Sequence, residues 1–410
     1  MENYEKTLEY IHSLGMFSHP AGLSRITEVM QKLANPQRSL YSVHITGTNG
    51  KGSTACMTAH ALMAAGYKTG LFISPYILDF RERIQINGDF IPKNTLVRLA
   101  KKVADTGVSL TEFEFITAVG ILYFFESKCD ICVFETGLGG RLDATNILPD
   151  TLPVITKIGL DHTAVLGDTI GAIAGEKAAI IKSGTAVTCY GQDKAAFDVI
   201  KEKAHRLFVP VREELQVHRC DITGNKFSYK GKEYKTALGG EHQLQNATLA
   251  IETLSAVKLD VPYNAVYKGL SAATFPARLE VISQSPLAVL DGAHNPDGGA
   301  ALKRAMEPYK GRITAVVGMM RDKSVDEFLS SLLPMCKNVI AVRAADNPRA
   351  LSAQEMRDTA LKYHDTVYTA DSIPEAVLQA QKLSEKAPVF VFGSLYLAAA
   401  ARDELIKYFR

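Results

Sequence analysis

The residues best suited to chemistry lie in a glycine-rich turn within the stretch Tyr41–Gly66. Gly47, Gly50 and Gly52 have no Cβ atom, so the backbone can turn tightly and direct its N–H groups at phosphate oxygens. A helix expected to begin near Lys51 adds its free N–H groups and the positive end of its dipole. This stretch therefore predicts a cradle for the phosphates of a nucleotide.

Two side chains complete the cradle. Lys51 supplies a positive charge, and Ser53 supplies a hydroxyl for a phosphate or for Mg²⁺. The pattern departs from the common G-x-x-x-x-G-K-[ST] order, because Ile45 stands at the first glycine and Gly52 separates Lys51 from Ser53. The alternative is an ordinary glycine-rich turn beside a surface lysine, which the placement between strand and helix makes the weaker interpretation.

Three further polar residues follow predicted strands. The strands expected over 68–73, 130–134 and 152–158 lead into Ser74, Glu135 and His162. Because the carboxyl ends of parallel strands meet at one edge of a sheet, we expect Ser53, Glu135 and His162 to gather there. A carboxylate at that edge can hold a cation. The alternative roles are a salt bridge for Glu135 and a packed or solvated position for the histidine.

The elements that position these residues form two domains in an α/β protein. Residues 1–276 predict a P-loop-type ATPase domain with a mainly parallel sheet and a small β edge region over 186–240. The irregular stretch 258–286, with three prolines, predicts a linker. Strands and helices then alternate regularly, so residues 277–410 predict a smaller, doubly wound Rossmann-like domain.

The composition excludes several classes of protein. A net charge of +2 gives no reason to expect nucleic acid or an anionic membrane as partner. The six cysteines are scattered without a framework, as in a reducing cytoplasm. The N-terminus has no apolar secretory segment, and no apolar run approaches the length of a membrane span. We therefore expect a cytoplasmic protein.

Ten motifs together resemble the folylpolyglutamate synthases and dihydrofolate synthases of the Mur-ligase superfamily. They occur in the family's order and cover nearly the whole chain: GTNGKGS (47–53), SPYILDFRERIQING (74–88), TEFEFITA (111–118), ETGLGGRLDATN (135–146), GLDH (159–162), EKAAIIK (176–182), HQLQNA (242–247), PARLE (276–280), DGAHNP (291–296) and GSLY (393–396). Each motif alone is weak, but ten in register are specific.

The resemblance implies an ATP-dependent ligase. ATP would phosphorylate a folate carboxylate to an acyl phosphate, and the amine of L-glutamate would then displace phosphate. The implied substrates are L-glutamate, dihydropteroate and reduced folates, and the LDATN and TEFE stretches favour a bifunctional enzyme over a monofunctional folylpolyglutamate synthase. ATP and one or two Mg²⁺ ions are the implied cofactors, with K⁺ as a further candidate, and the family suggests a monomer.

The resemblance also implies roles for individual residues. The implied catalytic residues are Lys177, Lys51 and His294, and Lys177 matches the lysine that the superfamily carbamylates. The implied ATP-binding residues are Thr48, Asn49, Gly50, Lys51, Gly52, Ser53, Asn246, Arg278 and Asp291. The implied pterin-binding residues are Phe113, Glu114, Leu142, Asp143 and Ala144. The implied Mg²⁺ ligands are Ser74, Glu135 and His162, with Ser53 as a further candidate.

Three residues depart from the family's pattern. Tyr76 replaces the histidine common after Ser-Pro, which bears on a contact of the substrate loop. Ala277 replaces the usual glycine of a P-G-R motif, and Phe275 stands where tryptophan is frequent. The last two would stiffen a hinge near 270–280.

Three other functions compete with this one. A peptidoglycan-precursor ligase of the same superfamily is disfavoured, because the short leader before the cradle leaves no room for a UDP-binding domain. A nucleotide-dependent binding module would not need Lys177. A phosphotransferase with a stable phosphorylated product would turn over ATP without an amine acceptor.

Overall fold

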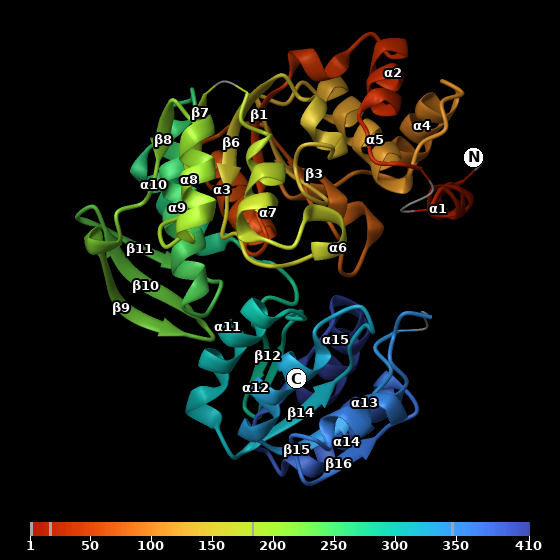
Figure 1. Ribbon diagram of the computed structural model, residues 1–410, viewed down its shortest axis with the longest axis vertical. Coiled ribbons are helices and arrows are strands. Elements are labelled where there is room, and N and C mark those ends of the chain that lie inside the picture. The colour runs from red at the N-terminus through yellow and green to blue at the C-terminus, as the bar shows by residue number, and fades with distance from the viewer. Residues whose placement is uncertain (1–2, 16–18, 183, 346–347) are drawn as a thin grey trace. The chain divides into compact units, whose positions relative to one another are not determined.

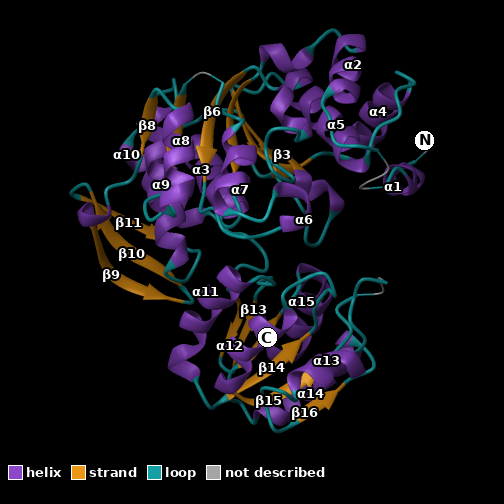
Figure 2. Cartoon of the chain, in the orientation of Figure 1, coloured by secondary structure: helices purple, strands orange, loops and turns teal. Residues whose placement is uncertain are grey.

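The chain folds as two compact units (Figure 1), as seen in a computed structural model that describes residues 3–15, 19–182, 184–345 and 348–410. Unit 1 comprises Met1–Leu215, Tyr229–Tyr234 and Gln245–Ala273. Unit 2 comprises Gln216–Ser228, Lys235–Leu244 and Thr274–Arg410. Figure 2 shows helices flanking the strands of each unit. The domain boundary between residues 276 and 277 stays a prediction.

Unit 1 is built on a large sheet whose strands are β1 (Tyr41–Thr46), β2 (Thr69–Phe72), β3 (Ile84–Ile86), β4 (Asp89–Phe90), β5 (Ile131–Glu135), β6 (Asp150–Ile155), β7 (Thr185–Thr188) and β8 (Arg206–Phe208). Their order is β4-β3-β2-β5-β1-β6-β7-β8. Strands β2 to β8 of this order run parallel, and β3 and β4 add an antiparallel hairpin. Strands β1, β5 and β6 are almost wholly buried, as in a parallel sheet that helices cover on both faces.

The helices that accompany this sheet are α1 (Tyr4–Ser13), α2 (Ser24–Lys32), α3 (Lys51–Ala64), α4 (Lys93–Ala104), α5 (Glu112–Glu126), α6 (Thr163–Leu166), α7 (Ile170–Ala178), α8 (Lys194–Lys203), α9 (His242–Ala256) and α10 (Tyr263–Ala272). Helix α3 packs on β1, β2 and β5, and α10 packs on α3. A second core joins α1, α2, α4 and α5 to the sheet, where the rings of Phe72 and Phe124 each lie 5.5 Å from that of Phe134. This aromatic cluster anchors β5, the strand that ends in Glu135.

Unit 2 contains the strands β12 (Glu280–Gln284), β13 (Leu287–Leu290), β14 (Ile313–Val317), β15 (Cys336–Ala341), β16 (Val367–Thr369) and β17 (Val389–Phe392). They form one sheet in the order β12-β13-β17-β14-β15-β16, parallel except for β12. Its helices are α11 (Pro296–Met306), α12 (Val325–Leu332), α13 (Ala353–Ala360), α14 (Ile373–Ser384) and α15 (Leu395–Phe409). Because α14 and α15 pack together while α11 to α13 form another group, the sheet is doubly wound. The predicted fold class is confirmed.

Residues 215–236 form a small antiparallel sheet. Its strands are β9 (Leu215–Asp221), β10 (Gly224–Tyr229) and β11 (Lys232–Thr236), in the order β11-β10-β9. This agrees with the short hairpin strands predicted for that part of the chain.

The predicted linker over 258–286 is wrong, because the segment holds helix α10 and strand β12. Pro262 stands at the N-cap of α10, a position that does not need its missing N–H group. The helix buries Ala265, Val266, Gly269 and Leu270, and a Cβ atom on Gly269 would lie 2.3 Å from the backbone of Ala61 in α3. Small residues at this close contact hid the helical pattern.

No helix in the described ranges combines the length and the apolar character that crossing a membrane requires.

Candidate functional site

The glycine-rich turn between β1 and α3 has the geometry that the sequence predicts. Gly50 takes a φ of 88°, and a Cβ atom there would lie 2.2 Å from Oδ1 of Asn246. A Cβ atom on Gly47 would lie 1.8 Å from Oγ1 of Thr156. Only glycine fits both places, and the structure brings the predicted ATP-binding residue Asn246 against the turn. Gly52 and Ser53 are buried in the first turn of α3.

The turn is tied to the segment after β6. The hydroxyl of Thr48 donates to the carbonyl of Gly159 at 3.0 Å and accepts from the Gly159 N–H group at 3.0 Å. The N–H groups of Thr48 and Asn49 both donate to the carbonyl of Lys157, at 2.9 and 3.3 Å. The backbone of the turn is therefore held in place by hydrogen bonds to the 157–159 segment.

Two lysines point at the turn. Lys51 Nζ donates to the carbonyl oxygens of Gly47 at 3.0 Å and Thr48 at 3.1 Å. Lys177 comes from α7 and donates to the same Gly47 oxygen at 2.8 Å. Burial, and then the nearby charge of Lys51, lower the pKa of Lys177 to about 7. The turn thus carries one charged amine and one amine that is partly neutral near pH 7.

Ser74 and Glu135 are neighbours. The N–H group of Ser74 donates to Oε2 of Glu135 at 3.1 Å, and the Glu135 side chain is buried. Arg83 donates from Nη1 to the Ser74 hydroxyl at 3.1 Å, and its guanidinium lies 5.1 Å from the ring centre of Tyr76. This contact of Arg83 was not predicted from the sequence, although the two arginines in the segment after Ser74 were a signal.

His162 lies at the N-cap of α6 with a left-handed φ of 51°. Its side chain is about half exposed, and Nε2 lies 3.9 Å from Oδ2 of Asp161. Across the described ranges no cluster of three or more His, Cys, Asp or Glu side chains is arranged to hold a metal ion. One buried carboxylate and one hydroxyl suit Mg²⁺, which usually takes few protein ligands and completes its shell with phosphates and water.

The loop after β5 carries three of the predicted pterin residues. Asp143 accepts N–H groups from Gly137 at 2.8 Å and from Leu138 and Thr145 at 3.0 Å. Burial raises the pKa of Asp143, and these donors oppose the rise. Asp143 therefore shapes the loop, which leaves Leu142 partly exposed and Ala144 buried.

Phe113 and Glu114 begin helix α5. A Cβ atom on Gly137 would lie 2.7 Å from the Phe113 ring, so this ring packs directly on the Asp143 loop. The Glu114 carboxylate accepts from the Thr111 N–H group at 2.8 Å and lies 3.0 Å from Nη2 of Arg25. Glu114 thus fixes the start of α5, and Phe113 faces the loop.

Two of the predicted residues of unit 2, Asp291 and His294, lie between β13 and α11. Asp291 is buried and accepts N–H groups from Leu279 at 2.7 Å and Ala293 at 2.8 Å. Burial raises the pKa of Asp291. Nδ1 of His294 is 2.8 Å from the carbonyl of Gly292, so the ring donates there. Asn295 caps α11, so Asp291 is not the cap of that helix.

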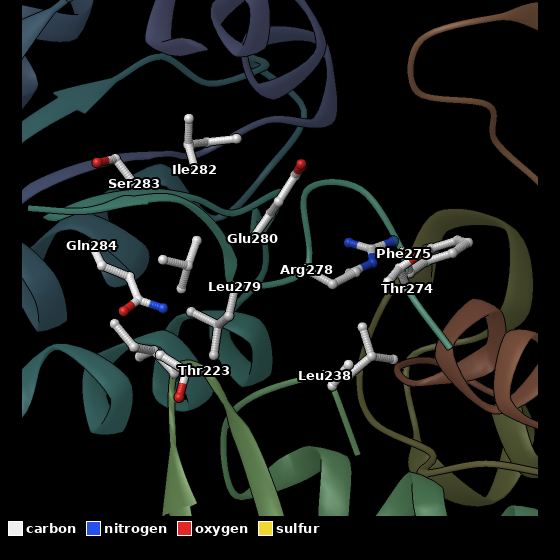
Figure 3. Close-up of a pocket in the computed structure, with 13 residues that line it drawn as sticks. Thr223, Leu238, Thr274, Phe275, Arg278, Leu279, Glu280, Ile282, Ser283 and Gln284 are labelled. Atoms are coloured by element: carbon white, nitrogen blue, oxygen red, sulfur yellow. The ribbon is translucent and has the colours of Figure 1, made fainter. Parts of the chain in front are cut away.

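Arg278 lies in a loop of unusual backbone conformation. Ala277 and Leu279 both have positive φ, at 55° and 47°. The first value explains why glycine is usual at position 277, since a Cβ atom is disfavoured there. Arg278 and Phe275 lie at one end of a cavity of about 380 Å³, with Gln284 and Thr223 at the other (Figure 3).

Two family descriptions match the chain. "Mur ligase middle domain" matches residues 45–254, and "Mur ligase, glutamate ligase domain" matches residues 277–395. Among curated relatives, a folylpolyglutamate synthase of Lacticaseibacillus casei is 35% identical, over 98% of this chain and 99% of its own length. A dihydrofolate synthase/folylpolyglutamate synthase of Bacillus subtilis is also 35% identical, with 98% and 99% covered.

Solved structures of folylpolyglutamate synthases are similar to this chain over nearly its whole length. The Mycobacterium tuberculosis folylpolyglutamate synthase complexed with ADP and AMPPCP superposes with a TM-score of 0.86 at 32% identity, over 98% of each chain. Escherichia coli FolC in complex with DHPP and ADP gives a TM-score of 0.87 at 30% identity, over 99% of this chain and 98% of the other. The similarity extends through both units.

Proposed function

The chain belongs to the folylpolyglutamate synthase and dihydrofolate synthase family of Mur ligases, and on that premise we propose that it is bifunctional, adding L-glutamate both to dihydropteroate and to the glutamyl tail of reduced folates. It is an ATP-dependent ligase of an acid and an amino acid. A carboxylate of the folate substrate attacks the γ-phosphate of ATP, ADP leaves, and the amine of glutamate displaces phosphate from the acyl phosphate.

The bifunctional proposal is supported by the dihydrofolate synthase/folylpolyglutamate synthase among the relatives. One observation supports the ligase mechanism: the buried amine of Lys177 lies against the glycine-rich turn, 2.8 Å from the carbonyl of Gly47. A simple phosphate-binding loop needs one lysine, and Lys51 already fills that role. A second, partly neutral amine at this place suits a lysine that reacts with CO₂ to form a carbamate. Its charge would then change from positive to negative, which suits a site that holds cations beside ATP.

Different residues of unit 1 would bind different parts of ATP and its metal ion. Within the turn from Thr48 to Ser53, the backbone N–H groups of residues 50–53 would hold the phosphates, because those of Thr48 and Asn49 donate to the carbonyl of Lys157. Asn246 would contact the adenine side. Lys51 offsets the repulsion between the substrate carboxylate and the polyphosphate. Mg²⁺ would be held by Ser74, Glu135 and His162 and would supply further positive charge at the γ-phosphate. Potassium is a further candidate cation.

The folate end of the substrate would bind along the loop shaped by Asp143. Phe113 offers a ring on the surface of this loop, and Leu142 is partly exposed there. Glu114 supports the site indirectly, because its carboxylate is engaged by Thr111 and Arg25. In unit 2, Arg278 and His294 would act on the phosphates and the reacting groups, while Asp291 holds their loops. We expect the enzyme to act as a monomer.

The test is phosphate release from Mg²⁺-ATP with L-glutamate, with product masses read in parallel. Turnover with 7,8-dihydropteroate establishes the synthase activity, and turnover with a reduced monoglutamyl folate establishes tail extension. Turnover with the folate alone would leave a monofunctional folylpolyglutamate synthase. If ATP is consumed without glutamate addition to either substrate, the proposal fails.

A further inference from the structure

Strand β1 carries a buried histidine for which the ligase reaction above has no role. His44 is fully buried, and Nε2 of its ring lies 2.7 Å from Oγ1 of Thr145 in the Asp143 loop. Residues 44 and 145 are far apart in sequence, so this contact ties the central strand of the sheet to that loop. A fully buried histidine calls for such a polar partner.

The direction of each hydrogen bond follows from the neighbours. Thr145 Oγ1 lies 2.5 Å from Oδ1 of Asp143, and a carboxylate accepts, so the threonine hydroxyl donates to it. The same oxygen must then accept from the histidine, which therefore carries its proton on Nε2. Nδ1 is buried and has no hydrogen-bond partner among the residues that the structure describes, as expected of the nitrogen without a proton.

A second residue of β1 holds the same loop. Thr46 lies two positions after His44 and so faces the same side of the strand. Its hydroxyl donates to the carbonyl of Gly139 at 2.6 Å. Strand β1 also leads directly into the phosphate-binding turn at Gly47. One strand thus positions both the turn and the loop.

We propose that His44 is a positioning residue for the folate substrate: its Nε2–H group orients the Thr145 hydroxyl toward Asp143, which in turn fixes the amides of Gly137 and Leu138 and the shape of the substrate loop. The role assigned to the loop rests on the proposed function. The relay, which is the chain of hydrogen bonds from His44 through Thr145 to Asp143, is supported by the distances given above.

The relay does not depend on pH in the physiological range. Burial, and then the charge of Lys182, lower the pKa of His44 to about 3. The ring therefore stays neutral and keeps a single proton for the bond to Thr145. Asp143 is the accepting end of the relay and is held in place by the N–H groups of Gly137, Leu138 and Thr145.

The test compares variants that keep or remove the donor. His44→Gln retains an N–H group at the end of the side chain, and His44→Leu removes it at similar volume. Thr145→Val removes the hydroxyl at nearly constant shape, and Thr145→Ser keeps it. For each we would measure KM for dihydropteroate and for ATP, the melting temperature, and amide hydrogen exchange over residues 136–146.

We expect His44→Leu and Thr145→Val to raise KM for dihydropteroate about tenfold, equivalent to about 1.4 kcal/mol, with KM for ATP unchanged. Exchange at the loop amides should accelerate in both, while His44→Gln and Thr145→Ser stay close to wild type at pH values from about 6 to about 8. Unchanged loop exchange in Thr145→Val, or an equal rise of both KM values, overturns the proposal.

Two further results distinguish a failure of the relay from a folding defect and from a failure of the proposed function. If His44→Leu does not fold, the Thr145→Val and Thr145→Ser pair decides, because Thr145 lies outside the sheet. If wild type shows no glutamate-dependent turnover, the proposed function fails, and hydrogen exchange still accepts or rejects the relay.

Discussion

The side-chain amines of Lys51 and Lys177 share one acceptor, the carbonyl oxygen of Gly47, at 3.0 and 2.8 Å. One amine comes from the helix that follows the turn and the other from α7, which follows in the chain more than a hundred residues later. Burial, and then repulsion from the charge of Lys51, lower the pKa of Lys177, so this amine gives up its proton more easily.

Lys177→Ala should lower glutamate-dependent turnover by about 100-fold or more, because a charge that acts on ATP is lost from a buried site. Lys177→Arg is the matched control, since it keeps a cation but cannot form a carbamate. If the arginine variant is as active as wild type, the carbamate role is rejected and a simple cation suffices. Initial rates of phosphate release with saturating substrates measure both.

The lowered pKa of Lys177 predicts a pH dependence. Its folded value of about 7 lies below the ordinary 10.5, so the unfolded chain binds the extra proton between these values. The free energy of unfolding therefore rises as pH increases from about 7 to about 10.5. Below about pH 7, Lys177 is protonated in the folded protein and destabilises it by the full amount. The neutral amine also reacts with CO₂, so added bicarbonate should activate the enzyme at about pH 8 more than at about pH 6. Equal activation at both values contradicts this prediction.

Gly50→Ala should weaken ATP binding at least about tenfold, because a Cβ atom would collide with Oδ1 of Asn246 and the φ of 88° is strained for alanine. Gly66→Ala is the control, since Gly66 has a similar φ of 92° but open space around a Cβ atom. The control should lose about 1 kcal/mol of stability and keep its affinity for ATP. Nucleotide titration by calorimetry separates the two, and equal ATP affinities in both variants would count against a role of this turn in binding.

Glu135→Gln should reduce the apparent affinity for Mg²⁺ about tenfold or more while the fold is kept, because the amide oxygen can still accept from the N–H group of Ser74. Glu176→Gln serves as control: its carboxylate pairs with Arg141 near the surface. Turnover as a function of Mg²⁺ concentration is the measurement. An unchanged Mg²⁺ curve for Glu135→Gln would remove this residue from the metal site.

Gly269→Ala should destabilise unit 1 by about 1–3 kcal/mol, because α10 and α3 touch at this glycine and a methyl group has no room there. Gly175→Ala in α7 is the matched helical control, since nothing lies within 4 Å of a Cβ atom there. Alanine at that position should be neutral or stabilise the protein by up to about 1 kcal/mol. Urea unfolding curves distinguish the two variants. Equal midpoints would show that α10 and α3 can accommodate the methyl group without loss of stability.

Features that depend on neighbouring residues could be predicted from the sequence. The glycines and Lys51 predicted the tight turn between β1 and α3, because a tight turn and a helix start are set by local backbone freedom. Strand and helix periodicity predicted the α/β fold of both units, since each pattern marks which faces are buried. The predicted strand ends placed Ser74 shortly after one strand and Glu135 at the end of another, and the structure has them just after β2 and at the end of β5.

Features that depend on contacts between distant segments became visible only in the folded chain. Spacing alone would not have placed Lys177 on the carbonyl of Gly47, because α7 and the turn meet only in the folded sheet. Helix α10 was missed because its small residues weaken the helical pattern. Their reason, the close contact with α3, is visible only in the fold. Asp143 and His44 look like separate polar residues in the sequence, and the fold joins them through Thr145. Partners for buried polar groups come from segments remote in the chain, so their roles appear only when the chain is packed.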